Sequence, residues 1–345
     1  MVVSLRRRQA VYGGHSENSI VPPFAIKSIL GMHVPNTARR SVIFIGEMID
    51  GDVFRPRATG FFVGVPSGKI RGMLTYLVTA EHVITGLAEK QKPIYCRVNR
   101  KDGRAAVEPL NPPQWWHHPE AERDPTDVVI AAVHANWDLL DHEPIPMPEH
   151  KGLNPGILAR RDIGLGDETF TIGLFRHHAG TERNIPIIRI GNIAALPEEP
   201  VRTRWGYMKA HLIEMRSIAG LSGSPVFIDI PGTQPPQGAV FGVPDPRYMP
   251  DPEQVNWFQY RLLGLVSSHF EIPELKEDSV VEDDKEGTEG INTGIAVVVP
   301  EQKIIETLYQ PDLKTERAKL EEQHMRQAAV LDTGAAIGPG PSSEP

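Results

Sequence analysis

The stretch Gly220-Leu-Ser-Gly-Ser-Pro225 places Ser222 between two glycines, and the apolar run Pro225-Val-Phe-Ile-Asp229 follows it directly. Glycine tolerates positive φ and the close approach of other backbone, so these glycines allow a tight turn before a strand. A nucleophilic serine needs such a turn, with its hydroxyl exposed and backbone N–H groups near the developing oxyanion. A plain β-turn before a strand has the same pattern, so the hexapeptide alone leaves both interpretations open.

Two stretches upstream carry residues that can act on a serine. The apolar run Tyr76-Leu-Val-Thr79 is followed by Ala80-Glu-His82, which places a histidine where a predicted strand stops. Asp127 stands directly before the apolar run Val128-Val-Ile-Ala-Ala-Val133, where a carboxylate can be desolvated and still hydrogen-bond a histidine. Each has a structural alternative. The histidine can be satisfied by a backbone carbonyl, and the aspartate can form a strand cap or an Asx-turn.

The three residues occur in the order His, Asp, Ser, separated by 45 and 95 positions. Thr79-Ala-Glu-His82, Asp127-Val-Val-Ile-Ala and Gly220-Leu-Ser-Gly-Ser-Pro225 resemble the motifs T-A-x-H, D-[IV]-A and G-x-S-G-x-P of the chymotrypsin-like (trypsin-like) serine peptidases. Leu263-Gly-Leu-Val-Ser267 resembles the strand of that family that binds the substrate backbone. The resemblance covers about residues 36–310 and is closest in style to disulfide-free bacterial members.

The fold that this resemblance implies agrees with the pattern of the whole chain. Short runs rich in β-branched and aromatic residues, separated by Gly, Pro and Asp, recur in both halves and predict an all-β protein. We expect a chymotrypsin-like double β-barrel, with barrels in about residues 36–150 and 151–310, and a C-terminal helical extension. Residues 1–35 are predicted to form an N-terminal arm, 311–331 a helix, and 332–345 a disordered tail rich in Gly, Pro, Ser and Ala.

The activity that the resemblance implies is that of a serine endopeptidase acting on a protein or peptide. His82 would take the proton of Ser222, whose hydroxyl attacks the scissile carbonyl to give an acyl-enzyme that water hydrolyses. Asp127 would orient the imidazole, and the amides of Gly220 and Ser222 would form the oxyanion hole. Ser267 would pair with the substrate backbone. The alternative is the same fold kept as a catalytically silent protein-binding or regulatory module.

Specificity is predicted from the residue six positions before the nucleophile, which in this family often lies at the base of the S1 pocket. Arg216 holds that position and Ser217 follows it, which predicts an acidic P1 residue bound by a charge-assisted hydrogen bond. The alternative is that Arg216 turns to solvent or pairs with Glu214. His269, two residues after Ser267, replaces the small residue often found there, and is predicted either to narrow the pocket mouth or to contact an acidic substrate side chain.

Charge and composition argue against nucleic acid, membranes and metals as partners. The net charge of −8 gives no positive field that would recruit nucleic acid or an anionic membrane, so neither is expected. Cys96 is the single cysteine and residues 1–20 lack the apolar segment of a secretory signal, which favours a cytoplasmic protein. The adjacent histidines His117-His118 and His177-His178 lack the Cys or carboxylate spacing of a zinc site, so we expect no metal and no cofactor. The helix predicted at 311–331 could also bind a regulatory protein partner.

Overall fold

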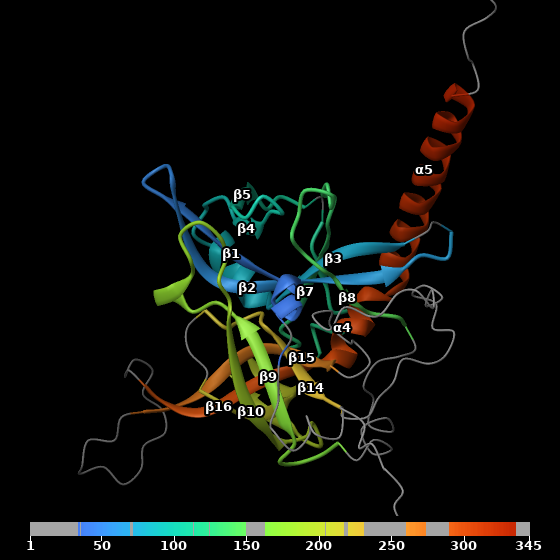
Figure 1. The fold of residues 1–345 in the computed structure, drawn as a ribbon. Helices are drawn as coiled ribbons and strands as arrows, with labels where there is room; N and C mark the ends of the chain where they lie inside the picture. The colour runs from blue at the N-terminus through green and yellow to red at the C-terminus, as the bar shows by residue number, and fades with distance from the viewer. Residues whose placement is uncertain are drawn as a thin grey trace, which may run out of the picture. The chain divides into compact units, whose positions relative to one another are not determined.

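Strands dominate the computed structural model of the chain, and helices are few (Figure 1). The described residues belong to one compact unit, Val34–Pro345. They are residue 34 and residues 36–69, 72–112, 114–123, 125–149, 163–203, 205–216, 220–230, 260–273 and 290–335. The predicted N-terminal arm, 1–35, therefore lies outside the described residues except for Val34.

The first half of the chain forms an eight-stranded sheet in the order β5-β4-β1-β2-β3-β7-β6, with β8 paired in parallel to β2. Its strands are β1 (Val42–Ile49), β2 (Val53–Pro66), β3 (Met73–Thr79), β4 (Tyr95–Asn99), β5 (Ala105–Pro109), β6 (Trp116–His117), β7 (Val129–Ala132) and β8 (Ile145–Pro146). The 3-10 helix η1 (Asn36–Ser41) precedes β1, and the helix α2 (Glu81–Ala88) follows β3. Apolar runs predicted β1, β2, β3 and β7, whereas β4, β5, β6 and β8 carry no such run.

The second half closes into a six-stranded barrel in the order β10-β13-β16-β15-β14-β9. Its strands are β9 (Glu168–Gly173), β10 (Ile187–Ala195), β13 (His211–Glu214), β14 (Pro225–Asp229), β15 (Tyr260–Pro273) and β16 (Gly290–Pro300). The 3-10 helix η2 (Arg176–His178) follows β9, and a separate hairpin of β11 (Pro200–Thr203) and β12 (Gly206–Lys209) follows β10. Buried apolar side chains, among them Ile193, Ile213, Val226 and Val298, fill the barrel. All six barrel strands were predicted from the sequence, but the hairpin was not.

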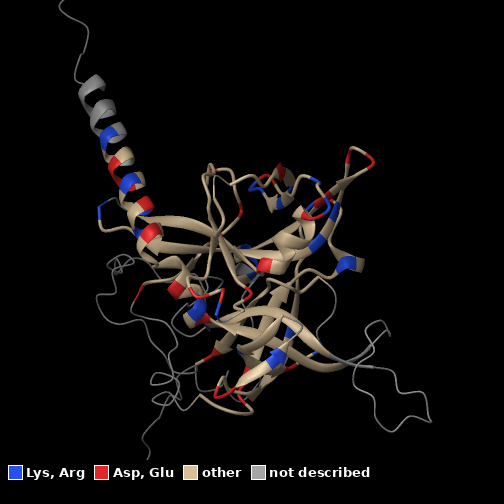
Figure 2. Ribbon diagram, turned by 180° about the vertical axis from the view of Figure 1, so that it is seen from behind, with Lys and Arg blue, Asp and Glu red and all other residues tan. Residues whose placement is uncertain are grey.

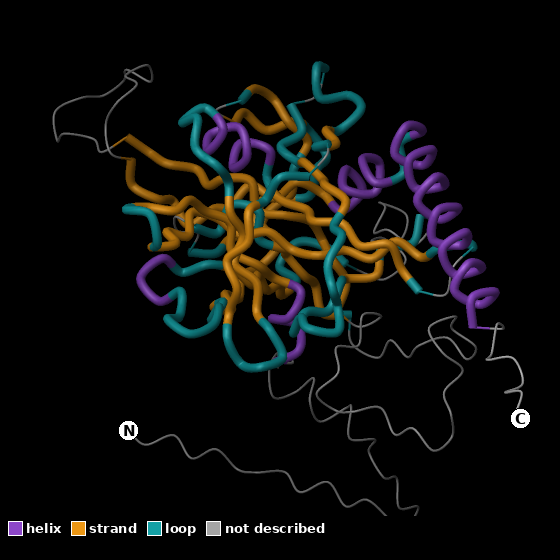
Figure 3. Tube along the Cα trace, turned by 90° about the horizontal axis from the view of Figure 1, so that it is seen from above, coloured by secondary structure: helices purple, strands orange, loops and turns teal. Residues whose placement is uncertain are grey.

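Two helices end the described chain, α4 (Glu301–Leu308) and α5 (Pro311–Ala335), and both lie at one side of the strands in Figure 3. The guanidinium of Arg317 on α5 donates to Leu308 O at 2.8 Å and lies 5.6 Å from the ring of Tyr76 on β3, which joins α5 to the first sheet. Lysines, arginines and acidic residues alternate along α5 (Figure 2). Within the described part of the chain, no helix has both the length and the apolar composition needed to cross a membrane.

The all-β class, with two barrel-like sheets and C-terminal helices, is confirmed. One boundary needs correction. The helix α5 begins at residue 311 as predicted but runs past 331 to Ala335, so the predicted disordered tail loses residues 332–335. Adding residues to an existing helix needs no new nucleation, which explains why it continues into the Leu331-Asp-Thr-Gly-Ala335 stretch. Residues 336–345 of that tail lie outside the described residues.

Candidate active site

His82 is held by Asp127 through two hydrogen bonds. Its Nδ1–H donates to Asp127 Oδ2 at 2.7 Å, and its backbone N–H donates to Oδ1 at 2.9 Å. His82 is the second residue of α2, so its N–H is one of the first four amides of the helix, which have no carbonyl partner within it. Ala80, the N-cap residue, supplies no side-chain acceptor. Asp127, 45 residues away, therefore caps α2 and orients the imidazole with one carboxylate.

The carboxylate of Asp127 is buried and accepts a third hydrogen bond, from Ser267 Oγ–H on β15 at 2.6 Å. Its side chain is 4% exposed, whereas that of His82 is 18% exposed. Burial alone would raise the pKa of Asp127. The hydrogen bonds and charge of His82 and the hydrogen bond from Ser267 outweigh burial, so that the pKa of Asp127 is lowered. An ionised Asp127 keeps the His82 proton on Nδ1 and leaves Nε2 as an acceptor.

Ser222 lies in a tight turn, residues 220–224, directly before β14. Gly220 and Gly223 both have positive φ, 110° and 81°, as the sequence predicted for a nucleophile turn. Ser224 N–H donates to Leu221 O at 2.8 Å, and Gly223 N–H donates to Val266 O on β15 at 2.7 Å. Backbone hydrogen bonds therefore fix the path of the chain on both sides of the serine.

Thr59 on β2 ties this turn to the first sheet. Its N–H donates to Ser222 O at 3.0 Å, and its Oγ1–H donates to Gly220 O at 2.9 Å. Thr79 Oγ1–H donates in turn to Thr59 O at 2.8 Å, and Thr79 stands three residues before His82. The turn that carries Ser222 is thus connected by short hydrogen bonds to the strand that leads into His82.

Gly223 packs directly against the same strand end. A Cβ at this position would lie 2.1 Å from Thr59 O and 2.4 Å from Thr79 Oγ1, so only glycine fits there. Among the described residues, no hydrogen bond joins the Ser222 hydroxyl to His82; the Ser222 turn is linked through Thr59 to Thr79, at the end of the strand before His82. Catalytic hydrogen bonds are often long or misaligned in unliganded enzymes, so this geometry leaves the triad prediction open.

The amides of Gly220 and Ser222, predicted to form the oxyanion hole, make no hydrogen bond within the described part of the chain. Two donors on a tight turn beside the serine are what an oxyanion site requires.

Trp205, which the sequence did not single out, lies against the imidazole. Its ring centroid is 4.7 Å from that of His82, with the two planes 31° apart. It lies between β11 and β12, short strands in which exposed residues alternate with buried or partly buried ones and which carry no apolar run. No signal in the sequence connects this hairpin with His82, because the contact is long-range.

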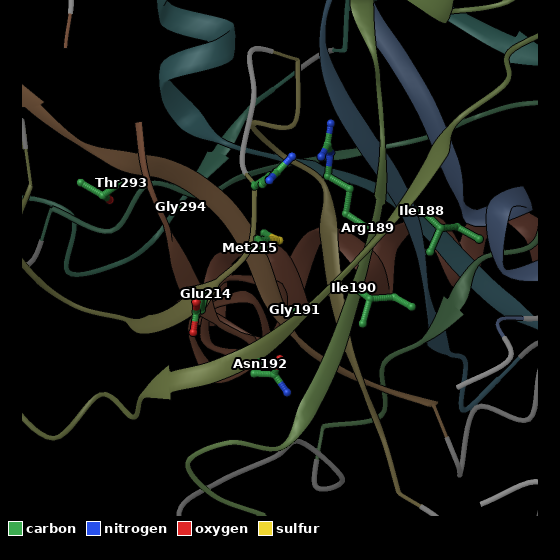
Figure 4. A pocket seen from close by; sticks show the side chains of 10 residues that line it. Ile188, Arg189, Ile190, Gly191, Asn192, Glu214, Met215, Thr293 and Gly294 are labelled. Atoms are coloured by element: carbon green, nitrogen blue, oxygen red, sulfur yellow. The ribbon is translucent and has the colours of Figure 1, made fainter. Parts of the chain in front are cut away.

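The predicted specificity residues do not all meet at the serine. Arg216 is exposed and lines a hollow of about 630 Å³ together with Arg189 and Glu214 (Figure 4). The lining of this hollow includes neither the three predicted catalytic residues nor Ser267 and His269. The exposure of Arg216 fits the alternative in which it turns to solvent, and no ion pair joins Arg216 to Glu214 within the described residues.

His269 lies on β15, partly buried, with its Cα opposite that of Ala296 on β16. Ser217 lies outside the described residues, so its assignment to the pocket stays a prediction. Within the described ranges, no group of three or more His, Cys, Asp and Glu side chains is arranged to hold a metal ion.

Comparison with known proteins gives likenesses of fold. No family model and no curated relative matches the sequence. Among solved structures, the MamO protease domain from Magnetospirillum magneticum in its apo form is similar at 14% identity and a TM-score of 0.43, over 78% of this chain and 96% of that one. Deg5 is similar at 17% identity and a TM-score of 0.35, over 56% of this chain and 76% of that one. The chemistry of the site therefore has to be argued from this chain's own residues.

Proposed function

We propose that the chain is a serine endopeptidase that cleaves peptide bonds through an acyl-enzyme on Ser222. The observation that carries the proposal is the His82–Asp127 pair, in which both carboxylate oxygens accept from the same histidine. A histidine with only a structural role needs a single hydrogen-bond partner, whereas His82 makes two hydrogen bonds to the same carboxylate. Here the pair stands next to a glycine-flanked serine turn that packs on the strand end leading into His82.

The proposed reaction uses the same groups in both halves, and His82 acts first as base and then as acid in each. His82 Nε2 accepts the Ser222 proton while the serine oxygen attacks the scissile carbonyl, and Asp127 stabilises the imidazolium. The amides of Gly220 and Ser222 bind the oxyanion, and each such donor is worth roughly 2.7–4 kcal/mol of transition-state stabilisation. His82 then gives the proton to the leaving amine. A water, deprotonated by the same imidazole, hydrolyses the acyl-enzyme in the second half.

We further infer a preference for acidic substrate side chains, bound in the hollow that Arg216 and Arg189 line. Arg216 and Arg189 line one hollow, and the pKa of Arg189 is lowered by burial and by the positive charge of Arg216. Arg189 Nε is buried and has no hydrogen-bond partner in the described residues. A carboxylate entering the hollow would relieve the repulsion of the two guanidinium groups, and the planar fork of arginine suits a carboxylate.

The deciding experiment is active-site labelling. Purified chain and its Ser222→Ala variant are treated with a fluorophosphonate probe and then with a mixed peptide library read by mass spectrometry. We expect the probe on Ser222 of the wild type alone, and cleavage products from the wild type alone. Equal labelling of both proteins, or labelling of neither, would favour the silent binding module instead. An acidic P1 preference that survives Arg216→Ala and Arg189→Ala would remove the role of the hollow.

A further inference from the structure

Trp205 covers one face of the imidazole that the proposed reaction uses. The ring separation of 4.7 Å and the small angle between the planes describe a tilted stack, and offset stacks of this kind are attractive. The indole thus occupies space beside His82 that a substrate side chain would otherwise enter. Because His82 lies on α2, after β3, and Trp205 in the hairpin after β10, this contact joins the first half of the chain to the second.

Hydrogen bonds fix the backbone of the turn that carries Trp205. In the β11–β12 register Thr203 lies opposite Gly206, with Trp205 in the connecting turn. Thr203 Oγ1 accepts from Trp205 N–H at 3.2 Å and donates to Gly206 O at 2.8 Å. At the other side, a Cβ added at Gly206 would lie 3.3 Å from Pro125 Cγ, so the turn lies close to Pro125, two residues before Asp127. The turn is therefore braced against the segment that carries the carboxylate.

The path of a substrate explains which side chain meets the indole. Ser267 on β15 donates to Asp127, so this point of β15 lies beside the His82–Asp127 pair. A peptide that adds to β15 with its scissile residue at Ser222 has its preceding residue, P2, next to Ser267 and the imidazole. Successive side chains of an extended peptide alternate in direction, so the P2 side chain points to the His82 face.

We propose that Trp205 walls the P2 subsite and restricts it to small side chains such as Gly, Ala and Ser. This proposal rests on the proposed function and adds its substrate class. A hydrophobic wall discriminates between side chains by size. Each extra methylene that the subsite cannot hold should lower kcat/KM by roughly 10–200-fold. Trp205 acts here on specificity and takes no part in bond making.

The first test compares peptides that differ only at P2. The wild type should cleave a P2 Ala peptide at least tenfold better than its P2 Leu or P2 Phe counterpart. Trp205→Ala should bring these values within about threefold by raising kcat/KM for the large side chains, and Trp205→Phe should lie between the two. Tyr207→Ala is the matched control, since Tyr207 is an aromatic on the same hairpin that is 67% exposed.

The second test does not depend on catalysis. In protein labelled on histidine, the indole should shift the His82 ring-proton resonances through its ring current, with assignment by His82→Gln. Trp205→Leu should remove that shift, while Tyr207→Leu should leave it unchanged. An unchanged His82 resonance in Trp205→Leu overturns the stack and the proposal with it.

The two failures can be told apart. If the probe labels Ser222 but the wild type cleaves P2 Phe as well as P2 Ala, the Trp205 proposal is wrong and the proposed function stands. The proposal is equally wrong if Trp205→Ala changes both peptides by the same factor. If the probe does not label Ser222, the proposed function fails, and the subsite proposal fails with it even where the ring-current shift is present.

Discussion

The first sheet and the second barrel hold their parts of the candidate site by different means. The first half of the chain presents His82 through hydrogen bonds to one buried side chain, the Asp127 carboxylate, which also accepts a bond from Ser267 of the barrel. The second barrel presents Ser222 through backbone: two glycines at positive φ, hydrogen bonds between main-chain groups, and the close contact at Gly223. The acid–base half is therefore sensitive to the chemistry of single side chains, and the nucleophile half is sensitive to backbone conformation.

The largest effect should follow from Asp127→Asn. An amide in place of the carboxylate favours the wrong imidazole tautomer, so we expect kcat to fall on the order of 10⁴-fold. The structure should survive, since Asn can still accept the N–H of His82. Measured kcat on a cleaved library peptide checks this, with Asp138→Asn, an exposed aspartate, as control. A loss of less than tenfold would contradict the role of Asp127.

His142 in the first half of the chain and His211 in the second are buried, and acid should destabilise the fold through both. Burial lowers the pKa of His142 and of His211 to about 4, below the 6.5 of an exposed histidine. The unfolded chain then binds more protons between these values, so stability falls as the pH drops from 6.5 towards 4, by roughly 3 kcal/mol per histidine at most. Urea unfolding across this range measures the loss.

Substitution by leucine should affect stability differently at the two histidines, because they differ in their hydrogen bonds. His142 Nδ1–H donates to Arg40 O and its Nε2 accepts from Asn99 N–H, whereas His211 Nδ1 has no partner in the described residues. At pH 7, His142→Leu should cost about 2 kcal/mol and His211→Leu much less. Both variants should flatten the pH dependence, and a steep remaining dependence in the double variant would contradict the assignment.

The nucleophile half should fail through its backbone in Gly223→Ala. The added Cβ would lie within 2.4 Å of Thr59 O and Thr79 Oγ1, so the turn must move. Misplacement by about 1 Å can cost on the order of 100-fold, and we expect fluorophosphonate labelling to slow by that factor. Gly86→Ala in α2, where a Cβ meets nothing within 4 Å, is the control and should label normally. Normal labelling of Gly223→Ala would show that the contact is dispensable.

The smallest effect should come from Ser267→Ala, which removes one of three hydrogen bonds to Asp127. A hydrogen bond to a charged group is worth about 1.5–3 kcal/mol, and two others remain, so we expect about a tenfold loss in kcat/KM. If side chains hold the acid–base half as described, Ser267→Thr should retain most of the activity. Equal losses in both variants would mean that size at this position matters more than the hydroxyl.

The strands with continuous apolar runs could be predicted from the sequence, because a run that is apolar on both faces has to be buried in the core. The prediction failed for β4, where Arg97 and Asn99 alternate with apolar residues and look like a solvated edge. In the structure these polar side chains are buried. The Arg97 guanidinium donates to the carbonyls of Gly180 and Thr181 at 2.7 and 2.5 Å, and Asn99 bonds to Asn184. Those partners lie in the second half, so no local pattern identifies them.

The same division holds for the candidate site. His82, Asp127 and Ser222 could be identified as candidates from the sequence, because each stands where a strand begins, ends or turns, and those positions depend on local propensity. It takes the folded chain to show that Asp127 caps α2, that Ser267 shares its carboxylate, that Arg216 lines a hollow with Arg189, and that Trp205 covers His82. These contacts join residues far apart in the chain, and a pairing of that kind is fixed by how the sheets pack and not by the residues nearby.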